Sequence, residues 1–270
     1  MNDMPQSTSE NTWKIRPFAE TLLALSFLTR LPVPFIRTLD LPPLSQAMRF
    51  FPLAGAFIGC ISAGVLIAAN MLGLPSLLAA VVALAVGTLV TGALHEDGLA
   101  DVADGFGGGK TREARLEIMR DSHIGTYGTI ALVLSYIARA AIYEALAGVQ
   151  PLTILALFAG AAAFSRALVV DLLWATRPAR SDGLSVFAGR PSRRSALFSL
   201  LTGGIGAAAA AGIVLSLEVS VLAIAGGGIM LALMRALCMR QIGGQTGDVC
   251  GAVQVLTELT MLTVYVSTIR

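Results

Sequence analysis

Long apolar runs alternate with short polar segments along most of this chain. Seven of the runs approach or exceed the roughly 20 residues that a helix needs to cross the hydrocarbon core of a bilayer. Their continuous, alanine- and leucine-rich composition favours helices over strands. The pattern therefore predicts an all-α, polytopic integral membrane bundle that forms a single domain over residues 1–270. The predicted spans are Phe50–Leu72, Ser76–Leu94, Tyr127–Ala147, Leu152–Ala175, Ser195–Leu217, Ser220–Leu237 and Ala252–Ser267.

A shorter apolar segment, Phe18–Leu31, precedes the first span. It carries Glu20 and Arg30 and is followed by two prolines. Its length and charges predict a helix that lies in the membrane interface or re-enters the bilayer, with a full span as the lesser alternative. The polar tail before it, residues 1–17, lacks the apolar stretch and the small-residue cleavage site of a signal peptide.

The composition supports a membrane protein. Hydrophobic residues make up 55% of the chain and charged residues only 13%, whereas soluble domains carry about 25% charged residues. The net charge of +2 comes without a basic tract, so nothing indicates a nucleic-acid partner. Cys60, Cys238 and Cys250 lack the spacing of a metal or redox motif and are predicted to be free thiols.

Lysine and arginine residues predict the orientation of the chain in the membrane. They lie before the first span and after the second, fourth and sixth spans, and the three intervening turns contain neither residue type. By the positive-inside rule, we expect the N-terminus and the loops at 95–126, 176–194 and 238–251 to lie in the cytoplasm.

An acidic segment follows the second span. Glu96, Asp97, Asp101 and Asp104 place four carboxylates within nine residues, and on a helix the three aspartates fall on one narrow stripe. Carboxylates held this close repel one another, and a divalent cation would offset that repulsion. Because magnesium binds one or two carboxylates together with phosphate oxygens, the segment predicts a magnesium site at the membrane surface. The alternative is a solvated acidic face without a function.

A glycine-rich segment lies between the sixth and seventh spans. Gly243, Gly244 and Gly247 are expected to expose backbone N–H groups to substrate phosphates. Asp248 is expected to be a further metal ligand or a general base. The alternative, given equal weight, is an interhelical turn in which Asp248 caps the last helix. The complete set of predicted metal ligands is Glu96, Asp97, Asp101, Asp104 and Asp248.

Histidine and arginine residues complete the candidate site. His123 is expected to act as a general acid or base, or equally to be a polar interface residue. Arg120, Arg177 and Arg180 are expected to bind substrate, since guanidinium groups suit phosphate and pyrophosphate; positive-inside topology alone is the alternative. Arg166, in the fourth span, is expected to reach a substrate cavity from the cytoplasmic end. The other charges predicted within spans are Arg139, Glu144, Asp171 and Glu258.

Five short segments are similar to the motifs of a known family. They are residues 27–34, 51–55, 96–105, 120–128 and 243–251. They extend from the N-terminal helix to the last span, and the acidic segment combined with Gly-Gly-Gln-Thr-Gly-Asp at 243–248 is specific. On these residues the chain resembles the cobalamin synthase family, also called adenosylcobinamide-GDP ribazoletransferase.

The resemblance implies a magnesium-dependent transferase of cobalamin biosynthesis in the bacterial inner membrane, with its active site on the cytoplasmic side. In the implied reaction, a hydroxyl of α-ribazole displaces GMP from adenosylcobinamide-GDP to give adenosylcobalamin. With α-ribazole 5′-phosphate, the product is the 5′-phosphate of adenosylcobalamin. Asp104 or Asp248 would supply a base for the hydroxyl, while magnesium and arginines neutralise the phosphates. The implied partners are these substrates and the lipid bilayer, and a homo-oligomer is left open.

Two other functions are considered. CDP-alcohol phosphotransferases resemble Asp-x-x-Asp-Gly-x-x-Ala-Arg followed by Gly-x-x-x-Asp-x-x-x-Asp, which Asp101, Asp104 and Asp248 match in part. Two glycines stand in place of Ala-Arg, however, and Ala252 in place of the last aspartate. A metabolite transporter would place substrate groups near the membrane midplane, whereas here the polar segments gather at the cytoplasmic edge.

Overall fold

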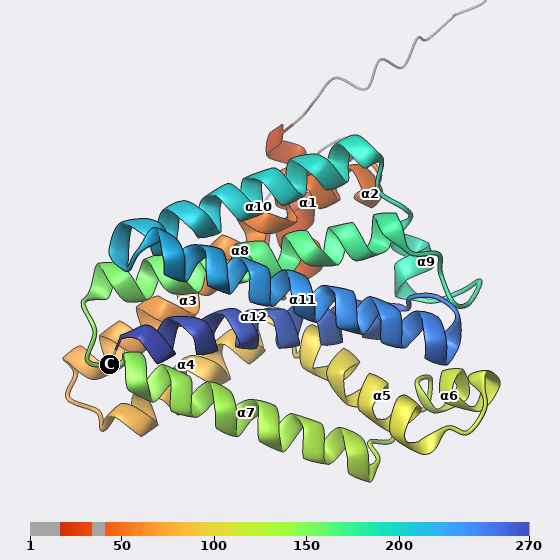
Figure 1. Ribbon diagram of the computed structural model, residues 1–270, viewed down its shortest axis with the longest axis horizontal. Helices are drawn as coiled ribbons and strands as arrows, with labels where there is room; N and C mark the ends of the chain where they lie inside the picture. Colours follow the sequence, from red (N-terminus) through yellow and green to blue (C-terminus); the bar gives the residue numbers. More distant parts are fainter. Residues whose placement is uncertain (1–16, 34–40, 270) are drawn as a thin grey trace, which may run out of the picture.

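The computed structural model describes residues 17–33 and 41–269, and within these ranges the regular structure is helical (Figure 1). An isolated β-bridge joins Pro178 to Gln245. The predicted all-α fold is confirmed. The helices are α1 (Pro17–Leu28), α2 (Leu44–Ala47), the 3-10 helix η2 (Met48–Phe50), α3 (Phe51–Met71), α4 (Ser76–Thr91), α5 (Leu94–Gly108), α6 (Arg112–Ile118), α7 (Thr126–Leu146), α8 (Pro151–Ala175), α9 (Leu184–Ala188), α10 (Arg193–Val214), α11 (Leu217–Ile242) and α12 (Gly247–Thr268).

The number of membrane spans agrees with the sequence pattern. Among the described residues, six helices are long and apolar enough to cross a membrane: α3 with its preceding turns, α7, α8, α10, α11 and α12. The helices α4 and α5 pass the same test as a pair bent by 90°, which makes seven spans when the pair counts as one. α11 and α12 extend beyond their predicted limits because the C-cap Gly243 and the N-cap Thr246, rather than the apolar residues, set their ends.

A buried ion pair holds α1 against the segment before α3. Glu20 is fully buried and accepts hydrogen bonds from Arg49 (Nε to Oε2, 2.6 Å) and Gln46 (Nε2 to Oε1, 3.1 Å). With 12 residues, α1 is about 18 Å long, which is too short for a span and agrees with the predicted interfacial or re-entrant helix. Most of the predicted polar tail, residues 1–16, and residues 34–40 lie outside the described residues.

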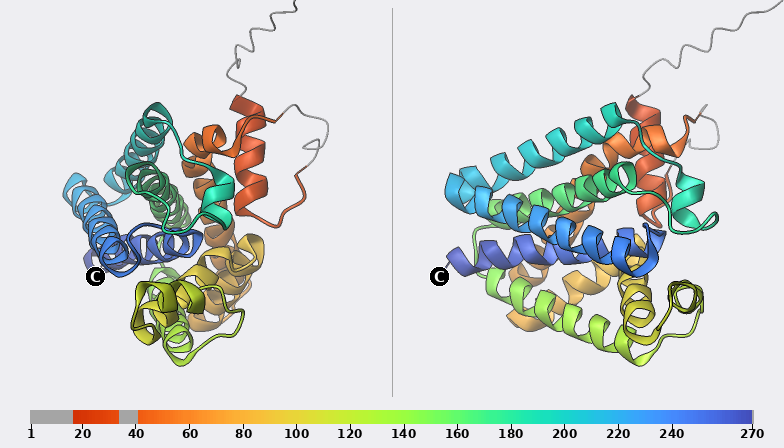
Figure 2. Two further views of the ribbon diagram at one scale, coloured as in Figure 1. Left: turned by 90° about the vertical axis from the view of Figure 1, so that its right-hand side faces the viewer. Right: turned by 45° about the vertical axis from the view of Figure 1, so that its right-hand side comes forward.

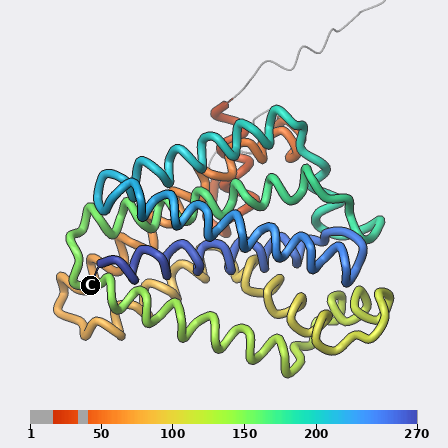
Figure 3. Tube along the Cα trace, viewed as in Figure 1, coloured from red at the N-terminus to blue at the C-terminus, as the bar shows by residue number. Residues whose placement is uncertain are grey.

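The long helices run side by side along the long axis of the molecule (Figures 1 and 3). The turns between α3 and α4, between α7 and α8, and between α10 and α11 lie at one end, together with the last residues of α12. At the opposite end lie α5, α6, α9 and the turn between α11 and α12, which we call the polar end (Figure 2). The three loops predicted to share one side of the membrane therefore lie at the same end.

Small residues let α3 approach the central helix α8. A methyl group added at Gly55 would collide with the backbone of Ala162, and one at Gly59 with the backbone of Phe158. Contacts through small residues are typical of helix packing in membranes. α8 is buried along most of its length, in keeping with this close contact.

A sharp bend turns α5 away from the direction of α4. Gly92 and Ala93 adopt φ values of 65° and 58°, and the Gly92 N–H closes the end of α4 by bonding to Leu89 O. A left-handed conformation is rare for a residue with a Cβ atom such as Ala93. The bend lays α5 across the polar end. Since α5 carries four carboxylates, we place it outside the membrane-spanning part of the bundle.

Candidate active site at the polar end

The acidic segment forms the helix that its spacing predicts, but its aspartates occupy different environments. Asp97 is exposed, Asp101 is half-buried and Asp104 is buried. A cleft of about 430 Å³ lies beside this helix, between α5, the loop before α7, and α7 itself. Of the predicted site residues, Glu96, Asp97, Asp101, Arg120 and His123 line this cleft.

Several charged side chains, most of them carboxylates, act on Asp101. Burial, followed by the negative charges of Asp248, Asp97 and Asp104, raises the pKa of Asp101 to about 7, and the Arg180 guanidinium only partly opposes this shift. A carboxylate with a pKa this high releases electrostatic repulsion when it binds a proton or a cation. The acidic helix therefore has the electrostatic property that suggested a metal site from the sequence.

The glycine-rich segment meets the acidic helix through backbone contact. A methyl group at Gly98 of α5 would lie 2.6 Å from the Asp248 carbonyl oxygen, and one at Gly251 of α12 would lie 2.9 Å from the His95 carbonyl oxygen. Only glycine permits two helices to cross this closely. The two motifs, about 150 residues apart in the sequence, therefore come together at one place, as predicted.

Asp248 is not the helix cap that the alternative interpretation required. Thr246 occupies the N-cap position of α12, and its side chain accepts a hydrogen bond from Val249 N. The Asp248 carboxylate instead accepts a hydrogen bond from the Thr246 hydroxyl (3.1 Å) and lies 3.5 Å from Nη2 of Arg180. The helix-cap alternative is therefore wrong, because Thr246 is the N-cap of α12.

Asp104 has a structural role that the sequence did not reveal. Its two carboxylate oxygens accept hydrogen bonds from Gly125 N (2.7 Å) and Gly128 N (2.8 Å), at the N-terminus of α7. Unpaired N–H groups and the helix dipole make this a favourable position for a carboxylate. Asp104 thus positions a neighbouring helix, and its expected role as a metal ligand or general base stays a prediction.

Glu96 and Arg166 both belong to ion pairs inside the bundle. Glu96 is buried and accepts a hydrogen bond from Arg139 at Oε1 (2.9 Å), while its Oε2 has no hydrogen-bond partner among the described residues, so its role as a metal ligand stays a prediction. Arg166 is buried in α8 and pairs with Glu258 of α12, so it does not line the cleft beside α5. Both pairs line a polar cavity of about 30 Å³ inside the bundle. In each pair the opposite charges offset part of the cost of removing the partner from water.

The arginine-rich loop lies directly against the glycine-rich turn. Gln245 N donates to Arg177 O (2.9 Å), and Ala179 N donates to Gln245 O (2.8 Å). Arg177 Nε donates to Gly243 O (3.0 Å). The pairing holds Arg180 beside Asp248, where the guanidinium is largely buried and its Nη1 has no hydrogen-bond partner within residues 17–33 and 41–269. The predicted arginine cluster is thus in reach of the acidic helix.

Arg112 and Arg120 join the segment between α5 and α7 to this cluster. Arg120 makes a two-oxygen contact with Asp182 (2.6 and 2.8 Å). Arg112, which the sequence analysis did not include in the site, donates to Ile242 O (2.9 Å) and to Ala179 O (2.5 Å). It holds the C-terminal end of α11 against the arginine-rich loop, and the only sequence signal for it was its place in a positively charged loop.

The three glycines of the second motif have packing roles. Gly243 is the C-cap of α11 with φ 73°, a conformation that glycine adopts at low cost. A methyl group at Gly244 would collide with Arg177 O (2.5 Å), and one at Gly247 would lie 3.2 Å from Leu184 Cβ. These contacts explain the glycines without a ligand, and their role in phosphate binding stays a prediction.

His123 lies at the exposed rim of the cleft. Its Nδ1 is 2.7 Å from Asp121 Oδ1, and its backbone N–H donates to the same oxygen (3.0 Å). The backbone and side-chain hydrogen bonds from His123 lower the pKa of Asp121. The carboxylate orients the imidazole, so that a proton-transfer role for His123 remains compatible with its position.

Three of the expected metal ligands, Asp97, Asp101 and Asp248, act on one another through their charges, and magnesium binding by them stays a prediction. Asp97, Asp101 and Asp248 offer hard oxygen donors near one another. Within the described part of the chain, no three or more Asp, Glu, His or Cys side chains lie close enough together to hold a metal ion by themselves. The donor set thus suits a cation that takes its other ligands from phosphates and water.

The comparisons with known proteins agree on one family. The family model described as cobalamin-5-phosphate synthase matches residues 20–266 of this chain. A protein of Azorhizobium caulinodans is 47% identical over 252 residues, which cover 92% of this chain and 95% of that protein. Proteins of Mesorhizobium japonicum and Bradyrhizobium diazoefficiens are 42% and 43% identical, and the aligned residues cover 91% of this chain and 92% of each relative. All three are named adenosylcobinamide-GDP ribazoletransferase. No solved structure gives a significant match.

Proposed function

This chain belongs to the cobalamin-5-phosphate synthase family, and from that membership we propose that it joins adenosylcobinamide-GDP to α-ribazole and releases GMP. We extend the proposal to α-ribazole 5′-phosphate as an acceptor, which would give the 5′-phosphate of adenosylcobalamin. The observation that carries the proposal is the meeting of the acidic helix, Asp248 and Arg180 at one end of the bundle. Transfer at a phosphoanhydride requires positive charge that neutralises the phosphates and oxygen ligands that hold a metal ion, and residues of these kinds meet here.

The proposal assigns the phosphates to the arginine side of the site. Arg180 is held beside Asp248, and its Nη1 has no partner in the described part of the chain; guanidinium groups suit phosphate oxygens well. Arg120, in the loop before α7, and Arg177, in the loop after α8, lie at the same end of the bundle, although each already contacts a group of the protein. The phosphates would therefore exchange some of these contacts for their own.

The proposal includes magnesium as the cofactor. Asp97, Asp101 and Asp248 would hold it, because their carboxylates are hard oxygen donors with unrelieved mutual repulsion. When bound, the ion would neutralise charge on the diphosphate. Since the carboxylates come from both α5 and α12, the contact of these helices at Gly98 and Gly251 would fix the alignment of the acceptor hydroxyl with the phosphate.

Two groups are candidates for accepting the proton of the α-ribazole hydroxyl. Asp248 lies beside the acidic helix, and His123 lies at the rim of the cleft with its Nδ1 bound to Asp121. Asp104, the other base expected from the sequence, is the less favoured candidate, since each of its oxygens already accepts a backbone hydrogen bond. His123→Ala should remove the acidic limb of the pH–rate profile if the histidine is the base and leave it in place if Asp248 is.

The proposal places the protein in the bacterial inner membrane, with the polar end facing the cytoplasm. Its support is the group of six to seven apolar helices together with the positive loops at that end. The comparisons give no support to a CDP-alcohol phosphotransferase or a transporter.

The direct test measures GMP release from adenosylcobinamide-GDP by membranes containing this protein, with α-ribazole and magnesium. The expected result is release that depends on all three additions and stops on chelation of magnesium. Membranes with Asp97→Asn serve as the matched control. Release of GMP without α-ribazole would indicate a hydrolase, and the absence of release under all conditions would refute the proposed function.

A further inference from the structure

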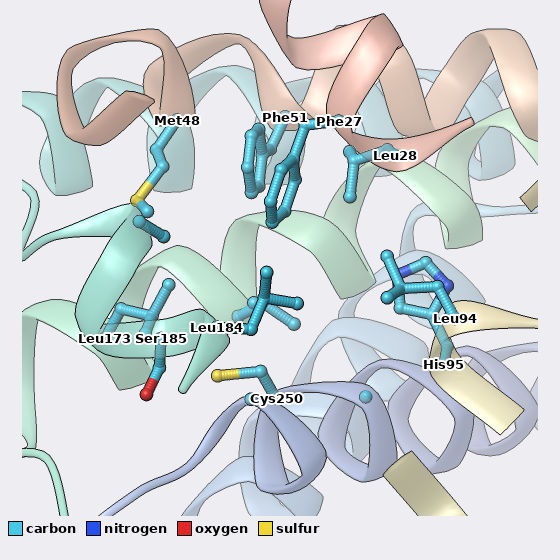
Figure 4. A pocket seen from close by; sticks show the side chains of 14 residues that line it. Phe27, Leu28, Met48, Phe51, Leu94, His95, Leu173, Leu184, Ser185 and Cys250 are labelled. Carbon is cyan, nitrogen blue, oxygen red and sulfur yellow. The ribbon is translucent and has the colours of Figure 1, made fainter. Parts of the chain in front are cut away.

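A second, apolar pocket lies directly behind the glycine-rich turn (Figure 4). The stacked rings of Phe27 and Phe51, with centroids 5.7 Å apart and 15° between their planes, form one side of it. Leu184 of α9 and Cys250 of α12 lie across from the rings in the same view. The pocket has a volume of about 50 Å³, and its lining is predominantly apolar. It therefore suits a small apolar group rather than an ion or a phosphate.

This pocket borders the proposed active site. Its wall includes Gly247, Cys250 and Gly251, which lie on the first turns of α12 on either side of Asp248. His95, from the first turn of the acidic helix, lines the pocket as well. The pocket therefore lies within one helical turn of Asp248 along α12.

Of the chemical groups in the two proposed substrates, one matches the pocket. The diphosphate is charged, and guanine presents several hydrogen-bonding groups that an apolar wall would leave unsatisfied. A corrin ring exceeds the volume of about 50 Å³ by far more than a single benzimidazole does, so that it would require a much larger displacement of the walls. The dimethylbenzimidazole base of α-ribazole is planar, largely apolar and carries a ring nitrogen as its free acceptor. Aromatic walls such as those of Phe27 and Phe51 favour such a ring.

We propose that this pocket binds the dimethylbenzimidazole base of α-ribazole and thereby selects the acceptor. The inference rests on the proposed function and adds to it the residues that recognise the base. The cavity is narrow, with room for a few water molecules, so that entry of the base requires its α9 wall to move outward. That wall is a five-residue helix between Gly183 and Gly189, whose φ values are 92° and 77°.

The test compares two substitutions on the same short helix. Leu184 lines the pocket and is 43% exposed, whereas Phe187 is 81% exposed and does not line it. Leu184→Glu places a charge at the pocket wall, and we expect KM for α-ribazole to rise about tenfold or more. The KM for adenosylcobinamide-GDP should stay within about twofold of the parent value. Phe187→Glu should leave both constants at the parent values.

A second variant and a second acceptor separate the outcomes. Leu184→Trp, which fills the pocket, should raise the same KM. The second acceptor is a nucleoside that carries adenine in place of dimethylbenzimidazole. Leu184→Glu should weaken its binding, relative to the parent protein, by a smaller factor than it weakens the binding of α-ribazole. An unchanged KM for α-ribazole in both Leu184 variants would overturn the pocket assignment while leaving the transferase activity in place. A rise in the KM for adenosylcobinamide-GDP alone would assign the pocket to the other substrate and also overturn it. Absence of transfer by the parent protein would instead refute the proposed function, and the inference with it.

Discussion

At the scale of single residues, the three aspartates of one helical stripe have different surroundings. Asp97 faces solvent, Asp101 is half-buried among like charges, and Asp104 binds two backbone N–H groups of α7. The same residue type on the same face therefore serves different purposes, because the elements packed against the stripe differ from one end to the other. Substitutions should separate these purposes.

We expect Asp97→Asn and Asp101→Asn to lower turnover about 100-fold or more with little change in stability, because each removes a charge that the reaction needs. Asp104→Asn should instead destabilise the protein by about 1–2 kcal/mol, since it weakens the hydrogen bonds that cap α7. Turnover and thermal unfolding of the purified variants in detergent would measure both effects. Parent-like stability of Asp104→Asn with complete loss of turnover would restore Asp104 to the catalytic group.

The pKa of Asp101 predicts how the magnesium requirement depends on pH. Burial and neighbouring carboxylates raise that pKa to about 7, so the metal-free carboxylate is protonated below this pH and a cation must displace the proton. The magnesium concentration for half-maximal GMP release should therefore rise by up to about tenfold for each unit below pH 7. It should level off above pH 8, about one unit past the pKa. A requirement that stays constant between about pH 6 and pH 8 would contradict this electrostatic account of the site.

At the scale of elements, the site depends on how closely α5 crosses α12. Gly98 packs against the backbone of Asp248, and Gly251 packs against the backbone of His95. Neither contact has a flexible side chain that could move aside. The position of Asp248 relative to the acidic helix is therefore fixed by the absence of two Cβ atoms.

Gly98→Ala should separate the two helices, because its Cβ would lie 2.6 Å from the Asp248 carbonyl oxygen. We expect a loss of about 1–3 kcal/mol of stability and at least a roughly tenfold loss of turnover. Gly64→Ala in α3 is the matched control, since nothing beyond the surrounding turn of α3 lies within 4 Å of its Cβ position among the described residues, and it should be neutral or stabilise by up to about 1 kcal/mol. Full activity of Gly98→Ala would show that the close crossing is not required.

At the scale of the whole molecule, all three positive loops lie at the polar end and the short uncharged turns at the other (Figure 1). Arg112, Arg120 and Arg177 join these loops to one another through hydrogen bonds. The residues that orient the protein in the membrane by their charge are therefore partly the same residues that assemble the proposed site.

Cysteine labelling tests the orientation. In a background without Cys60, Cys238 and Cys250, new cysteines at Ser122 and Ser181 should resist an impermeant thiol reagent added to intact cells, because both lie at the polar end. A cysteine at Leu72, exposed in the turn at the opposite end, should react readily. Reaction of Ser122→Cys or Ser181→Cys from outside the cell would reverse the proposed orientation.

The sequence by itself determined the features that depend on local composition. Apolar runs of sufficient length specify spans, because a helix in lipid must satisfy its own backbone groups, and the spacing of the aspartates specifies their stripe. It also anticipated the meeting of the acidic and glycine-rich motifs, since both follow spans that return to the same side.

Only the tertiary structure decided what each polar group contacts. The partners of Asp104, Glu96 and Arg166 lie 21 to 92 residues away in the sequence, and no local pattern reveals a partner at such a distance. The cap of α12 depended on whether Thr246 or Asp248 pointed at the helix N-terminus, which their shared propensity leaves undetermined. Composition thus fixes where the charges lie along the membrane normal, whereas packing between helices decides which of them remain free to act.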